Sequence, residues 1–397
     1  MIKKGAMALN SREKFNSVMS FDDNNITMKT EFGFWAKTLK NWLGSGLKQT
    51  AEAPYINALD AKIVRASVDI AGSGELTDRN TLNYFGLDSY LVKFPFDLSP
   101  GLPAKLIEDN ENYKIYQDSY GLKKKEGKIT AGTPMVIDYP IKNKKDFYIY
   151  RDLYDDDYKK RLPQNWSSLK EELKNRDFPI RLGGGPYGFS FFPRHLMGDV
   201  VYMMSMYDDP KFLKEFNDFF LNLVMNYWSL ILKDVEVDCI FILEDIAYRS
   251  GSFISKDMFR EFMTPYYIIF MDFLKQFKVK NVLVDCDGLI DELIPLFMEA
   301  GVTGIFPIEA VNDVSEIREK YPRLQLMGGI DKKLLFKDGT KKGIDEELIK
   351  IKKLIAKGGY VPHIDHAVSE DVTWENFKYY REALNRIIDE GSDIKTS

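Results

Sequence analysis

The residues best suited to chemistry lie at the ends of short β-branched segments in the C-terminal half of the chain. Acidic side chains stand at each of these ends: Glu244 and Asp245, Asp285 and Asp287, Glu309, Asp331, and Asp365. Two of the three histidines, His363 and His366, flank the last of these acids. Carboxylates and an imidazole that meet in space can bind a divalent cation or exchange protons with a substrate. Each acid taken alone has a simpler explanation, because acidic residues after strands commonly cap the helix that follows.

Side-chain alternation separates the candidates within two motifs. In "VDCDG", Asp285 and Asp287 share one face of the strand, whereas Cys286 points to the other. We therefore expect Cys286 to be a buried thiol; the opposite register would make it a metal ligand instead. In "HIDH" the histidines are three residues apart and cannot share a strand face. We favour His366, which is nearer the loop, as the functional histidine and expect His363 to be structural.

The segments that carry these acids alternate with helix-length segments, which is typical of βα units. In "LIDELIPLFMEAG" the apolar residues have helical spacing, and Gly301 ends the pattern. The predicted strands lie at 90–98, 179–188, 239–245, 279–288, 302–309, 323–331 and 358–366, with an eighth near 61–70. This count predicts an α/β fold, a (β/α)₈ barrel, in which parallel strands bring all the acidic ends to the C-terminal face.

The chain of 397 residues shows no linker rich in proline, glycine or serine, so we predict one domain over 1–397. Within it we expect an N-terminal extension over 1–60 and a β-hairpin excursion over 112–150 that could cover the site. The glycine-rich "GGGPYG" allows a ligand to approach the backbone closely. It is not a phosphate-binding P-loop, because no lysine followed by serine or threonine comes after it.

Composition excludes several classes of function. The net charge is −5, with 55 basic and 60 acidic residues well mixed, which gives no reason to expect binding to nucleic acid or to an anionic membrane. The early lysines are not followed by an apolar signal segment, and no apolar stretch approaches the roughly 18 residues of a membrane-spanning helix. Cys239 and Cys286 are too few for a disulfide framework. We therefore expect a cytoplasmic protein whose partners are small molecules or other proteins.

Several motifs together resemble the uroporphyrinogen decarboxylase superfamily. They are "NSREKFNSVMSF", "GGPYG", "LEDIAYRSGSFISKDMFREFMTPYY", "VDCDGLIDELIPLFMEAGVTGIFPIE", "GGID", and "GGYVPHIDHAV" with "TWENFKYY". The resemblance implies a TIM barrel and one of two chemistries. One is the cofactor-free decarboxylation of uroporphyrinogen. The other is zinc-dependent methyl transfer between a corrinoid protein and a small methyl donor or acceptor.

The decarboxylases of this superfamily carry an arginine pair in an N-terminal "RQAGR"-type motif, which binds the substrate propionates. This chain has no arginine between Arg12 and Arg65, and Lys37 or Lys40 would be poor geometric substitutes. His366 does match the decarboxylase histidine by its spacing to "WENF". The resemblance therefore favours the methyltransferases over the decarboxylases.

The methyltransferases carry a His-x-Cys ligand pair after one strand and a cysteine after the last. Asp285, Asp287 and His366 stand at the matching positions. The resemblance thus implies a divalent metal on these three residues, zinc or a harder or redox-active ion. Glu244 and Asp245, at the same face, are candidates for a further ligand or for the catalytic acid beside His366.

The resulting hypothesis is a corrinoid-linked methyltransferase or demethylase, with the corrinoid supplied by a partner protein. A uroporphyrinogen decarboxylase and a non-catalytic barrel are the alternatives. The aromatic segments "EFGFW" and "YGFSFF" place Phe32, Trp35, Tyr187 and Phe192 as candidates for the wall of an apolar substrate pocket, although such rings also serve as core.

Overall fold

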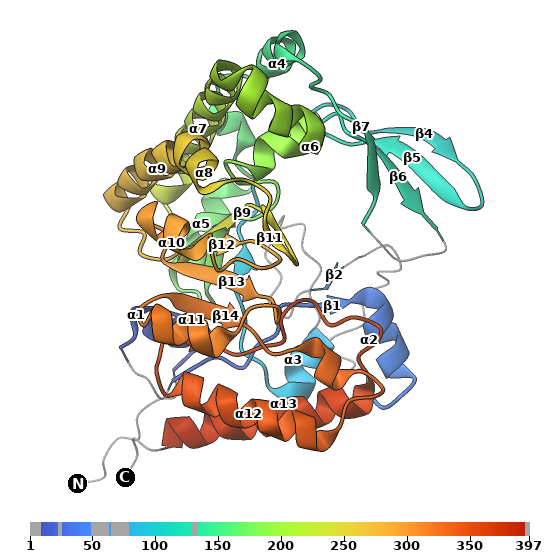
Figure 1. The fold of residues 1–397 in the computed structure, drawn as a ribbon, viewed down its shortest axis with the longest axis vertical. Coiled ribbons are helices and arrows are strands. Elements are labelled where there is room, and N and C mark those ends of the chain that lie inside the picture. Colours follow the sequence, from blue (N-terminus) through green and yellow to red (C-terminus); the bar gives the residue numbers. More distant parts are fainter. Residues whose placement is uncertain (1–8, 23–25, 49–62, 65–78, 129–132, 394–397) are drawn as a thin grey trace.

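The computed structural model describes residues 9–22, 26–48, 63–64, 79–128 and 133–393. Its centre is a curled sheet of seven parallel strands in the order β15-β14-β13-β12-β9-β8-β3 (Figure 1). The strands are β3 (Val92–Lys93), β8 (Ile180–Gly183), β9 (Cys239–Leu243), β12 (Val282–Asp285), β13 (Gly304–Ile308), β14 (Gln325–Gly328) and β15 (Tyr360–Val361). All seven coincide with predicted strands, so the α/β barrel-like fold is confirmed.

Helices follow the strands and cover the outer face of the sheet (Figure 1). They are α5 (Trp166–Lys174), α6 (Phe191–Asp208), α7 (Pro210–Leu232), α8 (Lys256–Phe262), α9 (Thr264–Gln276), α10 (Ile294–Glu299), α11 (Val314–Lys320), α12 (Lys341–Ile355) and α13 (Trp374–Asp393). Short turns of helix, η1 (Tyr158–Arg161) and η2 (Lys332–Leu335), lie between them. Within the described ranges, no helix is both long enough and apolar enough to cross a lipid bilayer.

The strand alternation divides the core into two layers. Cys239, Phe241 and Leu283 belong to a buried cluster in the lumen of the barrel. Ile240 and Val284 belong to the larger cluster between the sheet and the helices. Successive residues of β9 and β12 thus face opposite sides, which fixes the side on which the residues after each strand emerge.

The described part of the predicted eighth strand near 61–70 does not join this sheet. Of that range the structure describes β2 (Ile63–Val64), which pairs antiparallel with β1 (Phe34–Trp35); the rest lies outside the described residues. β1 leads into α2 (Ala36–Leu43). Sequence pattern alone cannot assign a strand to a sheet, because pairing is decided by tertiary contacts.

An N-terminal segment, residues 26–32, contacts both edges of the seven-stranded sheet. It follows α1 (Ser11–Ser20). The Thr27 hydroxyl donates to the Tyr360 carbonyl in β15 at 2.7 Å. On the other side, the Asp88 N–H, four residues before β3, donates to the Lys29 carbonyl at 2.7 Å. Residues 26–32 of the N-terminal extension therefore lie in the seam between the two edge strands.

The predicted excursion is a four-stranded antiparallel sheet that projects from the barrel (Figure 1). Its strands are β4 (Lys105–Asp109), β5 (Tyr113–Gln117), β6 (Lys123–Gly127) and β7 (Met135–Asp138). The expected hairpin is β5 with β6, but the range 112–150 missed β4 and included helix α4 (Lys144–Arg151). β4 lacks strand alternation because its register shifts between Leu106 and Glu108, which leaves Ile107 as an extra residue. The remaining elements are α3 (Arg79–Phe85), β10 (Ala247–Tyr248) and β11 (Gly251–Ser252).

Candidate metal centre

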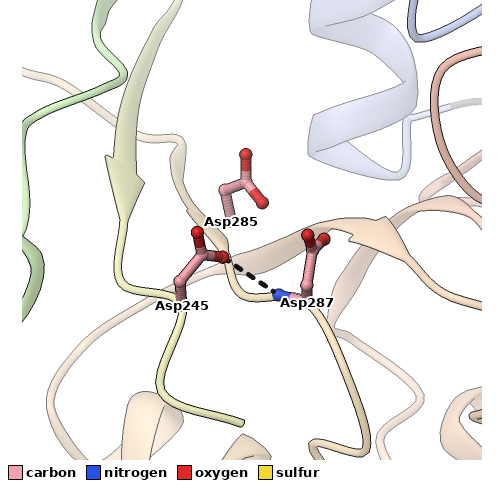
Figure 2. A group of neighbouring side chains, drawn as sticks. All are labelled: Asp245, Asp285 and Asp287. Atoms are coloured by element: carbon pink, nitrogen blue, oxygen red, sulfur yellow. Dashed lines mark hydrogen bonds between the residues drawn. The ribbon is translucent and has the colours of Figure 1, made fainter. Parts of the chain in front are cut away.

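Three aspartates meet at the C-terminal end of β9 and β12. Asp245, Asp285 and Asp287 each offer one carboxylate oxygen, and these oxygens lie within 4.8 Å of one another (Figure 2). The two strands are hydrogen-bonded neighbours with Leu243 opposite Asp285, so the residues that follow each strand emerge side by side. Asp285 and Asp287 share a face as alternation predicted. Asp245, expected as a catalytic acid or a further ligand, lies among the ligand candidates.

The backbone turns sharply at Asp245. Its φ is 46°, in the left-handed region, which non-glycine residues adopt rarely and which Asp tolerates better than most. The Asp287 N–H donates to Asp245 Oδ1 at 3.4 Å, which ties the two loops together (Figure 2). A strained conformation at a strand end commonly marks a functional site.

The electrostatics of this cluster favour a cation. Burial, then the negative charges of Asp245 and Glu309, raise the pKa of Asp287 to about 7, and the Lys332 ammonium only partly opposes this. Burial also raises the pKa of Asp245. Asp287 Oδ1 is shielded from solvent and accepts no hydrogen bond from any residue that the structure describes. A divalent ion would supply the missing partner and offset the repulsion, so the three aspartates fit a metal.

His366 lies at the margin of the aspartate cluster. Its Nε2 is 3.9 Å from Asp287 Oδ2, which is beyond hydrogen-bond distance. Its ring stacks on Phe32 with 4.9 Å between centroids, so the N-terminal segment orients this imidazole. Asp285, Asp287 and His366 are therefore brought together as predicted, but the tightest group of three contains Asp245 in place of His366.

Other acidic strand ends surround this cluster without joining it. Glu309 Oε2 accepts from the Gly288 N–H at 2.7 Å. Asp365 accepts from the Lys332 N–H at 3.4 Å and lies 3.9 Å from its ammonium group. Sequence reasoning missed Lys332, although its place after the "GGID" motif, next to Asp331, was the available signal. Asp331 itself caps η2 by accepting from the Lys333 N–H at 2.9 Å, which is the helix-capping role that acidic residues after strands commonly have.

Glu244 points away from the aspartates and caps α6. Its carboxylate is fully buried and accepts from the N–H groups of residues 189–191 and from the Tyr267 hydroxyl, at 2.7 to 3.2 Å. Burial raises its pKa to about 7 against the opposing effect of these hydrogen bonds. These contacts give Glu244 a structural role, and of the two candidate acids only Asp245 belongs to the cluster.

The remaining histidines and cysteines lie apart from the cluster. His363 is fully buried against the rings of Tyr90 and Phe306. His195, near the start of α6, contacts the ring of Tyr120. Burial lowers the pKa of His195 to about 4. Cys286 is buried in the outer core layer, as expected from alternation.

Two of the four predicted pocket residues lie away from the aspartate cluster. Tyr187 and Phe192 are fully buried in the helix layer, where Tyr187 contacts Trp228 and Phe192 contacts Phe220. Their segment follows β8 and turns its rings outward from the lumen. Trp35 is half-buried in β1.

Phe32 does lie at the site, between His366 and Phe306. Beyond Phe306 a small cavity opens in the lumen of the barrel. It is lined by Tyr90, Leu91, Arg181, Phe241 and Phe306. Sequence reasoning missed this cavity, although strand alternation would have placed Phe241 and Phe306 on the lumen side.

The comparisons with known proteins identify the family. The family model described as uroporphyrinogen decarboxylase (URO-D) matches residues 130–387, well over half of the chain. The chain belongs to the uroporphyrinogen decarboxylase family. No curated protein sequence matches it.

Two solved structures were compared with this chain. A methyltransferase from Methanosarcina mazei has a TM-score of 0.57 and 15% identity, with 96% of this chain and 99% of that chain covered. A putative vitamin-B12 independent methionine synthase from Listeria monocytogenes has a TM-score of 0.33 and 8% identity, with 57% of this chain and 69% of that chain covered. The first likeness shows that the fold extends over essentially the whole chain.

Proposed function

We propose that this protein is a metal-dependent methyltransferase that moves a methyl group between a small molecule and a corrinoid carried by a partner protein. The observation that carries the proposal is the group of three aspartates with a shielded, unsatisfied oxygen on Asp287. The M. mazei structure, which is named a methyltransferase and shares the fold along nearly its full length, supports the direction of the proposal. The raised pKa of Asp287 within this cluster favours a functional site over a non-catalytic barrel.

The proposed ligands are Asp245, Asp285 and Asp287, with His366 available as a fourth. Because Cys286 lies in the outer core layer, the donor set is oxygen with at most one nitrogen. Such a set binds zinc, but it equally suits manganese, iron or magnesium. When bound, the ion would act as a Lewis acid on the heteroatom that carries the methyl group.

The protein groups would handle the proton and the substrate. When the bond between the methyl carbon and the heteroatom breaks, its electron pair would stay on the heteroatom, and the partner's reduced corrinoid would supply the electron pair that accepts the methyl group. We assign the proton transfer to this heteroatom to the imidazole of His366, whose ring stacks on Phe32, acting while it is not bound to the ion. Phe32 and Phe306 would contact an apolar substrate from the lumen side.

Decarboxylation of uroporphyrinogen is the second candidate, favoured by the name of the matching family model and by the position of His366. The chain has no arginine between Arg12 and Arg65 to bind the substrate propionates. Lys37, one of two lysines in the corresponding segment, is paired with Glu370. We therefore rank it below methyl transfer, and propose a cytoplasmic location for either reaction.

One anaerobic experiment separates the two reactions. With a reduced Co(I) corrinoid protein and a panel of methoxylated or methylated compounds, we expect methyl-Co(III) to form, seen as a change in the corrinoid absorption spectrum. His366→Ala should slow this reaction roughly 10²–10⁴-fold if the histidine transfers the proton. With uroporphyrinogen we expect no coproporphyrinogen, and robust formation of that product would overturn the methyltransferase proposal.

A further inference from the structure

Asp245 holds its place in the aspartate cluster through a backbone that does not favour it. Its left-handed φ of 46° must be held by contacts from outside the turn. Two sets of contacts join this turn to residues 189–194, which lie just before and within the start of α6. One is the Glu244 carboxylate, which accepts from the N–H groups of residues 189–191.

The other contact is Arg194. Its Nη1 donates to the carbonyl of Glu244 at 3.1 Å and to the carbonyl of Asp245 at 2.6 Å. These carbonyls flank the N–H and Cα of Asp245, so a single guanidinium nitrogen fixes the orientation of the peptide groups on both sides of that residue.

The Arg194 side chain is itself anchored on two further sides. Its Nε pairs with Asp199 at 2.9 Å, and its guanidinium plane lies 4.8 Å from the centre of the Phe253 ring. Phe253 is in turn tied to the chain after Asp245, since its N–H donates to the Ile246 carbonyl at 3.1 Å. The planar guanidinium can serve all these partners at once, whereas an ammonium group on lysine cannot stack and donate in the same way.

We infer that Arg194 is a positioning residue of the metal centre: it holds the peptide groups around Asp245 so that this carboxylate reaches Asp285 and Asp287. The inference rests on the proposed metal site. It assigns no contact with substrate or metal to Arg194. Its part is to reduce the freedom of one ligand, and loss of such outer contacts typically weakens metal binding roughly 10–100-fold.

Arg12 provides a matched control. It is 20% exposed where Arg194 is 13% exposed, and it also pairs with a carboxylate, Asp238, at the opposite end of β9. Arg12→Met and Arg194→Met therefore remove similar side chains, one that contacts a residue at the start of β9 and one that contacts residues at its end. Only the second should change the metal centre.

The test is Mn²⁺ binding to the full chain, measured by the electron paramagnetic resonance signal of free and bound Mn²⁺, with the unfolding temperature recorded beside it. We expect Arg194→Met to weaken Mn²⁺ affinity roughly 10–100-fold and to alter the signal of bound Mn²⁺. Arg12→Met should lower the unfolding temperature but keep wild-type affinity. Arg194→Lys, which keeps the charge, should give a smaller loss in the same direction, and it decides the matter if Arg194→Met does not fold.

The possible failures are distinguishable. Wild-type affinity in the folded Arg194 variants, or an equal loss in Arg12→Met, would overturn the positioning role while leaving the metal site intact. Failure of the wild-type protein itself to bind Mn²⁺, Zn²⁺ or Fe²⁺ would overturn the proposed metal site and this inference with it.

Discussion

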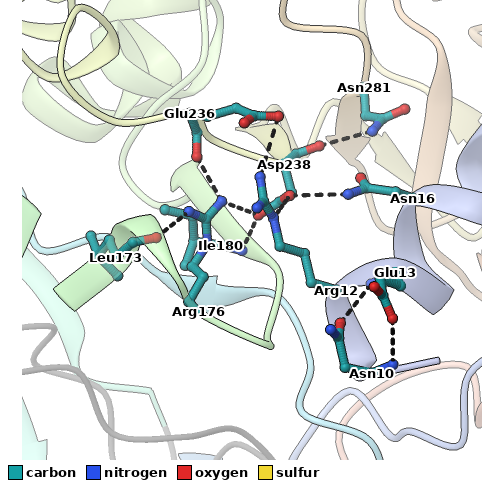
Figure 3. A network of polar contacts seen from close by, with 10 residues as sticks. All are labelled: Asn10, Arg12, Glu13, Asn16, Leu173, Arg176, Ile180, Glu236, Asp238 and Asn281. Atoms are coloured by element: carbon teal, nitrogen blue, oxygen red, sulfur yellow. Dashed lines mark hydrogen bonds and ion pairs between the residues drawn. The ribbon is translucent and has the colours of Figure 1, made fainter. Parts of the chain in front are cut away.

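Strand β9 begins next to one buried carboxylate and ends next to an acidic cluster, and the surroundings of the two differ. At the start, both oxygens of Asp238 are paired: Oδ1 with Arg12 at 2.6 Å and Oδ2 with Arg176 at 2.6 Å (Figure 3). Asn16 and the Ile180 N–H complete the set at 3.3 and 2.9 Å. At the far end, three aspartates face one another, and Asp287 Oδ1 accepts no hydrogen bond from the described part of the chain.

The difference teaches how to separate structural from functional carboxylates in a barrel. Asp238 links α1 to the starts of β8 and β9, and its partners are all supplied by the chain, so its role is complete in the folded protein (Figure 3). The aspartates at the other end lie close enough to repel one another, and the proposed metal would offset that repulsion. This agrees with the general rule that such barrels place stability at the N-terminal face of the sheet and chemistry at the C-terminal face.

The largest expected effect is the loss of metal from the C-terminal end. Asp285→Asn and Asp287→Asn keep the size of the side chain and remove a charged ligand, so we expect purified protein to contain no bound metal and methyl transfer to be abolished. Elemental analysis without chelator, with and without added Zn²⁺, Mn²⁺ or Fe²⁺, measures this. Asp331→Asn is the control, because that acid caps η2 and should leave the metal in place. Equal metal content in the wild type and in all three variants would contradict a functional role for the aspartates at the C-terminal end.

At the opposite end, Asp238→Asn should affect stability and not metal. It leaves Arg176, whose side chain is 2% exposed, as a buried charge without its carboxylate. Breaking a buried pair in this way costs about 3–5 kcal/mol in the free energy of unfolding. Urea unfolding measures this cost, and Mn²⁺ affinity of the folded variant should equal that of the wild type. A clear loss of metal affinity would mean that the two ends are coupled through β9.

A smaller effect is a pH dependence that only the C-terminal end should show. Burial and neighbouring acids raise the pKa of Asp287 from its ordinary value near 4 to about 7, so between these pH values the native state binds a proton that the unfolded chain has released. Metal-free protein should therefore lose stability as pH rises from about 4 to about 7, whereas Mn²⁺ affinity should rise. Asp287→Asn should flatten the stability profile only in part, because burial also raises the pKa values of Glu244, Asp245, Asp365 and Glu31. An unchanged profile in this variant would contradict the environment assigned to Asp287.

The smallest expected effect concerns Cys286, which separates Asp285 from Asp287 in the chain yet lies in the outer core layer. Cys286→Ala should keep metal and activity and cost at most about 1–2 kcal/mol for the small loss of packing. Metal content and thermal unfolding of this variant check both parts. Loss of metal from this variant would show that the thiol reaches the site and that the oxygen-rich ligand set is incomplete.

The sequence by itself determined the features that depend on local periodicity. Alternation along β12 is enough to put Asp285 and Asp287 on one side and Cys286 on the other, because successive side chains of a strand must face opposite ways. The succession of strands and helices is enough to predict parallel strands, whose ends meet at one face. Thus the place of the candidate site and two of its three aspartates were predictable.

The tertiary structure decided which neighbours complete the site. Asp245 joins the aspartates because β9 and β12 pair with Leu243 opposite Asp285 and because the chain turns at a left-handed Asp245, and neither fact is written in the spacing of residues. The carboxylate of Glu244, one position earlier, instead accepts hydrogen bonds from the N–H groups of residues 189–191 at the start of α6. The N-terminal segment brings Phe32 onto His366 across more than 300 residues of sequence. Contacts between segments so far apart depend on register and packing of the whole barrel, which no local pattern specifies.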